Sequence, residues 1–241
     1  LSCLDETSFT MHFANIWIIV SNSMTDSLII EKAISEILSK EFGTTEQLLE
    51  IHEVVYENDK PKVLRVDKES DDSSVIVYFP IKDEKFYLAV WLDTDPEILV
   101  RGVGTENYNS VYLKVTSDDF SLKELSKLTR LQSTKNWNKG DKREKGNSVY
   151  SFTALFFEPN PEPDEFEDKL KKLLDFLDQD KEGIKKLIEK ADAQIQVATT
   201  FHNGNTMLGG HHLDKSIIKR IGSYNLAIDF DLYAEGNFYK D

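Results

Sequence analysis

Cysteine is almost missing from this sequence, in which Cys3 is the only cysteine among 241 residues. A single cysteine cannot form a disulfide within the chain, and this scarcity favours a reducing compartment. Long apolar runs are missing too, because the apolar segment 16–20 is far shorter than the roughly 20 residues of a membrane-spanning helix. These absences exclude a disulfide-stapled secreted scaffold, and we expect a cytoplasmic location.

Common catalytic and cofactor motifs are also lacking. The sequence contains no GxSxG, HExxH or CxxC motif, and Gly102-Val103-Gly104 is not followed by the further glycine of a dinucleotide-binding turn. We therefore expect no catalytic residue, no cofactor and no bound metal. A triad assembled from distant residues leaves no local trace, so whether the protein is an enzyme stays open, with a non-enzyme favoured.

Positive charge is outnumbered throughout the chain. Its 29 Lys and Arg residues stand against 43 Asp and Glu residues, which gives a formal net charge of −14. Such a surface repels phosphate backbones and anionic headgroups, so we expect neither nucleic acid nor a membrane as a partner. It attracts a basic protein partner, and this attraction weakens as salt rises. Solubility alone would also explain the charge, and the oligomeric state stays open.

Residues 1–23 are interpreted as a doubtful leader or a disordered extension. Asp5 and Glu6 stand where a signal peptide needs positive charge, and the apolar segment after them is too short for its core. We expect the translated protein to begin at Met24.

Residues 24–105 are predicted to form a domain of one helix and an antiparallel meander sheet. Apolar residues at helical spacing predict a helix from Leu28 to Phe42, ended by Gly43. Short turn-rich breaks separate five predicted strands, over residues 51–56, 63–66, 75–79, 86–91 and 98–100. Such short connections favour antiparallel pairing, with the helix covering one face of the sheet.

Residues 106–241 are predicted to form a second α+β domain with a split βαβ-like arrangement. A polar loop is expected over residues 132–147. Two helices are expected within 164–190, the first with a single apolar face formed by Phe166, Leu170, Leu173, Leu174 and Leu177. The other elements expected are strands over 111–115, 148–157, 194–201 and 226–233 and short helices over 122–128 and 216–221.

Several short motifs follow one another in the second half. They include Trp137-Asn138-Lys139-Gly140-Asp141, Phe201-His202-Asn203-Gly204-Asn205 and Leu226-Ala227-Ile228-Asp229-Phe230-Asp231-Leu232-Tyr233. On these residues the segment from about 107 to 235 resembles a bacterial family, the domain of unknown function 4279. The resemblance implies an α+β fold and no particular chemistry, because the activity of this family is not established. Some acidic proteins of similar size inhibit toxins as immunity proteins, and by this analogy we consider the same role for this chain.

The first candidate binding loop contains Trp137, Lys139, Gly140 and Asp141. A lysine, a glycine and an aspartate in a tight turn can present backbone N–H groups and one positive charge to a ligand. The alternative is a structural turn, in which Gly140 adopts unusual backbone angles and Trp137 anchors the loop. The structural interpretation is favoured.

The second candidate loop contains His202 and Asn203. Its glycine-rich surroundings allow the backbone to approach a partner closely, whereas the spacing of the nearby histidines does not suit a zinc site. Asp229 and Asp231 share one face of the last predicted strand, about 7 Å apart. They are interpreted as its polar face, opposite Ile228, Phe230 and Leu232.

Two functional hypotheses follow. The first is a protein-binding module, such as an immunity-type toxin inhibitor that binds a basic partner. The alternative is a small-ligand sensor or an enzyme with a site between the two domains, formed by the loop 137–141 together with His202.

Overall fold

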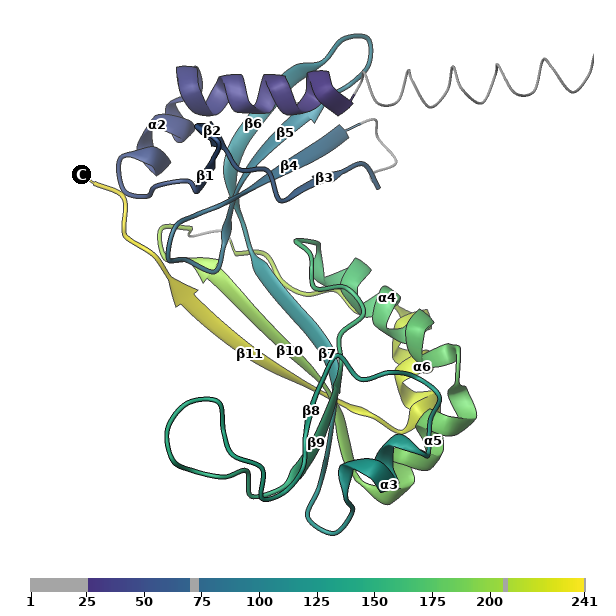
Figure 1. Cartoon of the computed structure of the whole chain (residues 1–241). Helices are drawn as coiled ribbons and strands as arrows, with labels where there is room; N and C mark the ends of the chain where they lie inside the picture. Colours follow the sequence, from purple (N-terminus) through teal and green to yellow (C-terminus); the bar gives the residue numbers. More distant parts are fainter. Residues whose placement is uncertain (1–25, 70–73, 206–207, 241) are drawn as a thin grey trace, which may run out of the picture. The chain divides into compact units, whose positions relative to one another are not determined.

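The computed structural model describes residues 26–69, 74–205 and 208–240 (Figure 1). The expectations for residues 1–23 and for Met24 lie outside this described part. Among the described residues, those up to Glu106 and those from Asn237 onward form one compact unit, and Asn107–Gly236 form another. Both units combine helices with a sheet, so the α+β fold class is confirmed. No helix in the described ranges has the length and apolar character needed to cross a membrane.

The first unit is an antiparallel sheet covered on one face by a helix (Figure 1). Its four strands follow the order of the chain: β3 (Arg65–Asp67), β4 (Ser74–Pro80), β5 (Tyr87–Asp93) and β6 (Leu99–Glu106). Each strand pairs antiparallel with the next, which confirms the predicted meander. The covering helix spans residues 26–39, and its apolar face is buried in the same core as β4 and β5.

The end of this helix differs from the prediction. It stops at residue 39, because Lys40 adopts a left-handed backbone conformation with φ of 55°. Such a residue ends a helix in the manner usually seen with glycine. Gly43, predicted to end the helix, instead begins the next one, α2 (Gly43–Leu49).

The first predicted strand, 51–56, is largely wrong. In this segment Val54 forms an isolated antiparallel bridge with Ile81, and Tyr56 begins the short hairpin of β1 (Tyr56–Glu57) and β2 (Lys60–Pro61). Its two turn residues, Asn58 and Asp59, both have positive φ, as a tight two-residue hairpin requires. The turn chemistry therefore sets the local structure more strongly than the apolar pattern before it.

The second unit contains a five-stranded sheet in the order β11-β10-β7-β9-β8. These strands are β7 (Tyr108–Ser117), β8 (Lys135–Trp137), β9 (Thr153–Phe157), β10 (Asp192–His202) and β11 (Ala227–Glu235). The polar loop predicted over 132–147 therefore includes a strand, and the strand predicted from residue 148 begins only at residue 153.

The predicted split βαβ unit is present. Both β9 and β10 pair antiparallel with β7, so they run parallel to each other on its two sides. They are connected by α4 (Phe166–Asp178) and α5 (Lys181–Lys190). A second crossover, through α6 (Lys215–Tyr224), leads to β11, which pairs parallel with β10 at the edge of the sheet.

The helices of the second unit lie on one side of its sheet, together with the short helix α3 (Leu122–Ser126) (Figure 1). The side chains predicted to form the apolar face of α4 are all buried: Phe166, Leu170, Leu173, Leu174 and Leu177. They pack in one core with apolar side chains of β7, β9 and β10. The other face of the sheet carries the alternate side chains, which include Tyr112, Phe156 and Gln196.

Candidate functional site

The two candidate loops lie at opposite ends of the sheet in the second unit. Trp137, the last residue of β8, pairs with Ala154 near the beginning of β9. His202, the last residue of β10, pairs with Glu235 at the far end of β11. Because β9 and β10 run in the same direction, these positions are at different ends. The structure therefore does not bring the loop 137–141 and His202 together in one site.

An aromatic stack orders the loop that follows β8. The rings of Trp137 and Tyr150 are stacked with centroids 4.2 Å apart, and the indole Nε1 of Trp137 donates a hydrogen bond to the backbone oxygen of Phe152 at 3.1 Å. The guanidinium of Arg143 lies over the ring of Tyr150, 5.2 Å from its centroid. These contacts anchor the loop to the sheet, as expected for the structural interpretation.

The turn that contains Gly140 and Asp141 is closed by its own hydrogen bonds. Gly140 has φ of 90° and donates its N–H to the backbone oxygen of Tyr150 at 2.8 Å. The carboxylate of Asp141 accepts the backbone N–H of Asn138 at 2.7 Å. The groups that were considered as ligand contacts therefore maintain the turn.

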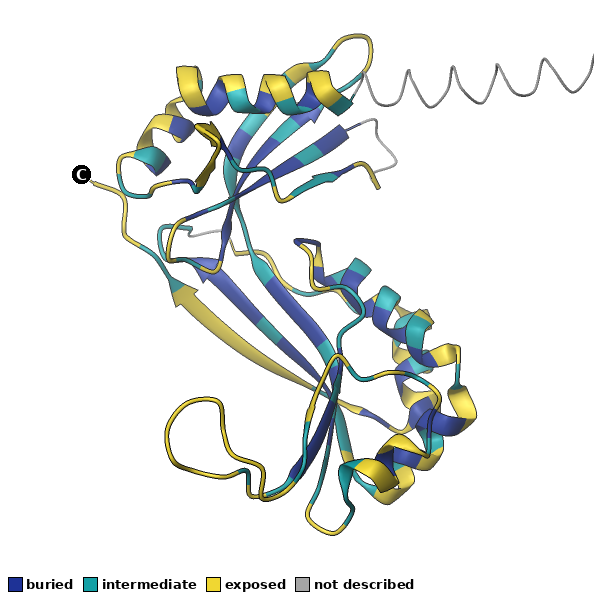
Figure 2. Ribbon diagram, viewed as in Figure 1, coloured by how far each residue is buried: buried dark blue, intermediate teal, exposed yellow. Residues whose placement is uncertain are grey.

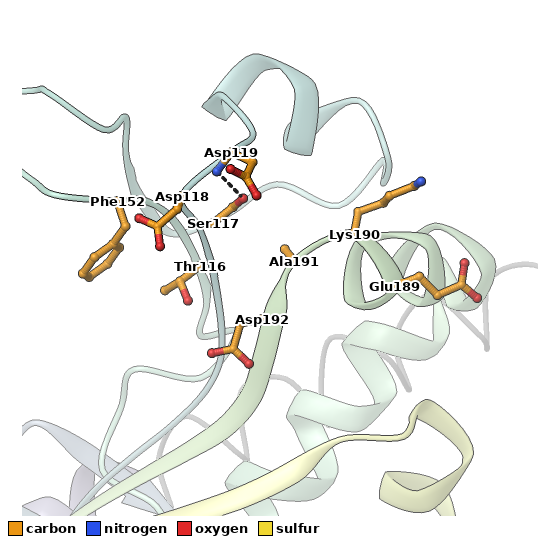
Figure 3. Close-up of a pocket in the computed structure, with 9 residues that line it drawn as sticks. All are labelled: Thr116, Ser117, Asp118, Asp119, Phe152, Glu189, Lys190, Ala191 and Asp192. Carbon is orange, nitrogen blue, oxygen red and sulfur yellow. Dashed lines mark hydrogen bonds between the residues drawn. The ribbon is translucent and has the colours of Figure 1, made fainter.

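A pocket lies at this end of the sheet, where β7 ends and β10 begins (Figure 3). Its volume is about 440 Å³, and its lining includes Asp118, Asp119, Phe152 and Asp192. The ammonium group of Lys139 donates a hydrogen bond to the backbone oxygen of Asp118 at 3.0 Å. The pocket is thus polar and rich in carboxylates, and Lys139 is bonded to one of the residues that line it.

His202 and Asn203 are held at the other end of the sheet. The side chain of His202 is buried, with 1% of the residue exposed. Asn203 donates its backbone N–H to Glu235 at 2.8 Å and its side-chain amide to the backbone oxygen of Gly236 at 2.9 Å. These contacts close the ends of β10 and β11, so neither side chain is presented as an exposed binding group.

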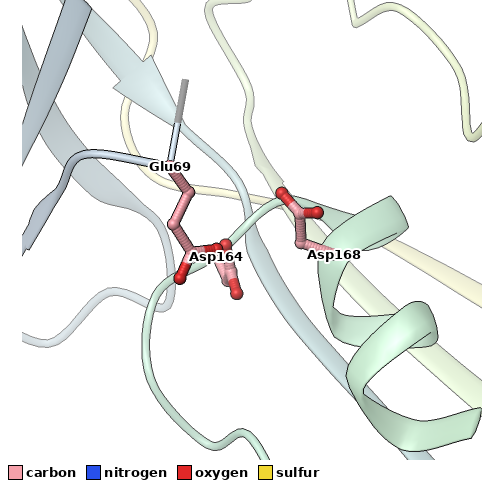
Figure 4. A group of neighbouring side chains, drawn as sticks. All are labelled: Glu69, Asp164 and Asp168. Atoms are coloured by element: carbon pink, nitrogen blue, oxygen red, sulfur yellow. The ribbon is translucent and has the colours of Figure 1, made fainter. Parts of the chain in front are cut away.

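Asp164 and Asp168 lie at the beginning of α4 (Figure 4). Asp164 is 2% exposed, and its carboxylate accepts hydrogen bonds from Lys172 at 2.9 Å and from the amide of Asn160 at 2.6 Å. A buried carboxylate needs such partners. Asp164 therefore has a structural role, because it connects Asn160, in the segment before α4, to Lys172 within that helix.

The carboxylates of Asp229 and Asp231 are the acidic groups best placed to meet a partner. Both residues are exposed on β11, on the sheet face away from the helices. Amide groups of β10 hold them: Gln196 donates to Asp231 at 3.0 Å and Gln194 donates to Asp229 at 3.4 Å. No lysine or arginine of the described ranges forms an ion pair with either carboxylate, although Lys114 lies on the same face two strands away.

Large apolar side chains accompany these carboxylates on the same strand. Phe230, Leu232 and Tyr233 are 36%, 61% and 48% exposed, and Figure 2 shows β11 exposed along nearly its whole length. Phe230 is partly supported from beneath by Phe166, with ring centroids 5.8 Å apart. Phe230 and Leu232 lie on one face of the strand, whereas Tyr233 lies on the other face with the two carboxylates.

The electrostatic effect of the carboxylates reaches the neighbouring tyrosines. Burial raises the pKa of Tyr112, and the negative charges of Glu158 and Asp231 raise it further. Burial and the charge of Glu158 also raise the pKa of Tyr108. Burial is the larger cause of both shifts, and the smaller contribution of the carboxylates arises because nearby negative charge disfavours the phenolate form.

Sequence reasoning correctly placed Asp229 and Asp231 on one face of the last strand but did not identify the strand as a sheet edge. It also did not select Gln194 or Gln196. A usable signal is the helix before residue 226, because strands joined by a crossover usually lie next to each other in the sheet. The exposure of Leu232 has no such signal, since the residue type alone predicts burial.

No curated protein and no solved structure matches this chain. The model of one family, the domain of unknown function 4279 (DUF4279), matches residues 106–235. The matched segment corresponds closely to the second unit, Asn107–Gly236, and includes all five strands of its sheet. The match extends over more than half of the chain, and the protein therefore belongs to the DUF4279 family.

Proposed function

We propose that this protein is a protein-binding module of the bacterial cytoplasm that binds a basic protein partner. The observation that carries the proposal is the exposed pair Asp229 and Asp231, which lacks a basic partner among the described residues and lies beside exposed Phe230, Leu232 and Tyr233. Aromatic residues next to charged groups are typical of binding surfaces. The formal net charge of −14 acts in the same direction, because it speeds the encounter with a positively charged protein.

The role that we propose is that of an immunity-type inhibitor of a toxin. An inhibitor acts by occupying a surface, so it needs a complementary face and no catalytic group. If the toxin comes from the same gene cluster, co-expression of this protein should protect the cells. Equal killing with and without this protein would contradict the inhibitor role.

Direct binding is tested by affinity capture from host lysate at low and high salt. The paired variant Asp229→Asn with Asp231→Asn is compared with a matched control, Glu162→Gln with Glu182→Gln, which removes the same charge from exposed positions elsewhere in the unit. We expect one basic protein to be captured in stoichiometric amount and released at high salt. Only the Asp229→Asn, Asp231→Asn variant should weaken its binding. Equal weakening by both pairs would mean that net charge, rather than this surface, drives binding.

The pocket of about 440 Å³ beside Lys139 supports a second candidate function, a small-ligand sensor with its site in the second unit. Its size is within the range of small-molecule sites. Replacing Lys139 and Asp118 by alanine should then abolish the rise in melting temperature produced by a ligand. A melting temperature that does not respond to any metabolite in a screen of the unsubstituted chain argues against the sensor.

A further inference from the structure

The outer side of β11 has the geometry of a strand that accepts another strand. β11 is nine residues long and pairs with β10 without a register shift, and the described part of the chain provides no strand on its other side. Natural proteins usually protect such an edge with a short strand, a bulge, a proline or a lysine. The sequence of β11, AIDFDLYAE, has neither proline nor lysine.

The directions of the backbone groups follow from one hydrogen bond. The backbone oxygen of Glu235 accepts the N–H of Asn203, the residue after β10, at 2.8 Å, so the backbone groups of Glu235 point toward β10. In a regular strand alternate residues point the same way, and the intervening ones point to the opposite side. The N–H and C=O groups of Phe230 and Leu232 therefore point outward. With those of Ile228 and Ala234, they form what we call the free edge of β11.

The side chains along this edge alternate in chemistry. Phe230 and Leu232 lie on one face of the sheet, and Asp229 and Asp231 lie on the other. We propose that the free edge of β11 binds an extended segment of a basic partner protein, in which lysine or arginine alternates with apolar residues. The inference rests on the proposed function and specifies how the partner is bound. Backbone hydrogen bonds supply affinity, and the alternating side chains supply specificity.

The charges on β11 argue against a second copy of this chain as the occupant. Antiparallel pairing of two copies centred on Phe230 places Asp229 opposite Asp231 twice. Centring the pairing on Asp231 places this residue opposite its own copy. Like charges directly opposite each other destabilise a strand pair. A partner with basic side chains at these positions converts the same repulsion into attraction.

The carboxylates are already positioned for such a strand. The amides of Gln194 and Gln196 fix Asp229 and Asp231 in place without cancelling their charge. Less side-chain entropy is therefore lost when a basic group arrives, and preordered groups of this kind favour binding. On the opposite face, contact with Phe230 and Leu232 buries apolar surface that is exposed in the chain alone.

Amide hydrogen exchange followed by NMR tests the edge directly, with a synthetic peptide of alternating lysine and valine as the probe. The amides of Phe230 and Leu232 point outward and should exchange fast in the chain alone. Those of Asp231 and Tyr233 are bonded to β10 and should exchange slowly. Saturating peptide should slow the exchange of Phe230 and Leu232 at least about tenfold. A block peptide of the same composition, with all lysines before all valines, serves as the control.

Two further probes separate backbone pairing from charge attraction. Two peptides are methylated on alternate backbone nitrogens, one at the lysines and the other at the valines. Their affinities should differ, because only one of these two methylation phases removes the N–H groups that face β11. The Asp229→Asn, Asp231→Asn variant should bind the unmethylated peptide about tenfold more weakly at low salt. The control variant Glu162→Gln, Glu182→Gln should bind it nearly as the unsubstituted chain does.

Each outcome has a definite meaning. Protection of Phe230 and Leu232 together with a difference between the two methylation phases supports strand addition. Equal binding of both methylated peptides overturns strand addition. Exchange at Phe230 and Leu232 that slows without peptide as the chain concentration rises also overturns it, in favour of self-pairing. Loss of the lysate partner with Asp229→Asn, Asp231→Asn but no edge protection overturns strand addition alone. A failure of both experiments overturns the proposed function as well.

Discussion

The two edges of the sheet in the second unit are protected by different means. At one edge, β8 has only three residues and continues into a loop fixed by the stacked rings of Trp137 and Tyr150. At the other edge, β11 has nine residues, is exposed, and carries Asp229 and Asp231. The first edge is protected by brevity and packing, whereas the second is protected only by charge. Packing excludes every incoming strand, but charge excludes only those of the same sign.

The largest effect is expected from Trp137→Ala, which removes the stack at the β8 edge. We expect the free energy of unfolding of the second unit to fall by about 2–3 kcal/mol, below the range for a fully buried tryptophan because part of the ring is exposed. Urea unfolding, monitored through the amide hydrogen exchange of each unit, measures this change. Leu232→Ala at the other edge should cost less than about 0.5 kcal/mol. Similar losses for the two variants would remove the distinction between the edges.

The next effect concerns the segment that leads to β8. The carboxylate of Asp180 accepts hydrogen bonds from the Thr129 hydroxyl and the Arg130 N–H, both at 2.7 Å, and also caps α5 through the N–H of Gly183. Asp180→Ala should lower the free energy of unfolding by about 1–2 kcal/mol. Asp180→Asn, which retains an acceptor oxygen, should recover most of this loss. A full loss with asparagine would mean that the charge, rather than the hydrogen bonds, is responsible.

The same hydrogen bonds, chiefly those from Arg130 and Thr129, lower the pKa of Asp180 below its ordinary value of 3.8. A carboxyl with a lowered pKa in the folded state stabilises the fold above its unfolded-state pKa. That stability is lost as the pH falls through the folded-state pKa. Acid unfolding of the Asp180→Asn variant should therefore be less steep below pH 4 than that of the unsubstituted chain.

A third effect lies beneath β11. His211 packs against Phe166 and Phe230, with centroid distances of 4.2 and 5.4 Å, and its burial lowers its pKa from the ordinary 6.5, a change that the charge of Glu167 opposes. A base with a lowered pKa binds fewer protons when folded than when unfolded. The free energy of unfolding should therefore fall as the pH is lowered below about 6.5. His211→Phe should reduce this slope in thermal melts recorded across the pH range, and an unchanged slope would assign it to other groups.

The smallest effect on stability is expected at the charged edge itself. Asp229→Asn with Asp231→Asn should change the free energy of unfolding by no more than about 0.5 kcal/mol, because both carboxylates are exposed and unpaired with any described cation. The same variant should, however, self-associate more readily than the unsubstituted chain in sedimentation velocity, because the like-charge repulsion is removed. If it remains unchanged in association state, charge is not what protects this edge.

Much of the fold could be predicted from the sequence. The spacing of Phe166, Leu170, Leu173, Leu174 and Leu177 predicted the face of α4 that is buried, and the meander of the first unit followed from its short connections. The split βαβ arrangement was also predicted correctly. These features depend on local periodicity and connection length, which a single sequence contains.

Other features could not be read from the sequence, for identifiable physical reasons. Lys40 ends the first helix in a left-handed conformation that its residue type does not favour. Strand β8 lies in a polar segment because an edge strand needs little apolar character. The candidate residues Trp137, Lys139, Gly140 and Asp141 were separated from His202 and Asn203 because they lie at opposite ends of the sheet, and strand direction and pairing are long-range properties. The turn interactions of the first four agree with the structural interpretation favoured for them.

The central position of β7 has a consequence for the kinetics of folding. This strand is the first of its sheet to be synthesised, yet its partner β10 is the fourth, and their pairing joins residues as far apart as Tyr108 and Thr200. Pairing over such long sequence separations makes folding slow, because the entropy of loop closure is lost before the contacts form. During synthesis one side of β7 therefore stays unpaired until α4, α5 and then β10 have left the ribosome. We expect this unit to be the part of the chain most dependent on chaperones.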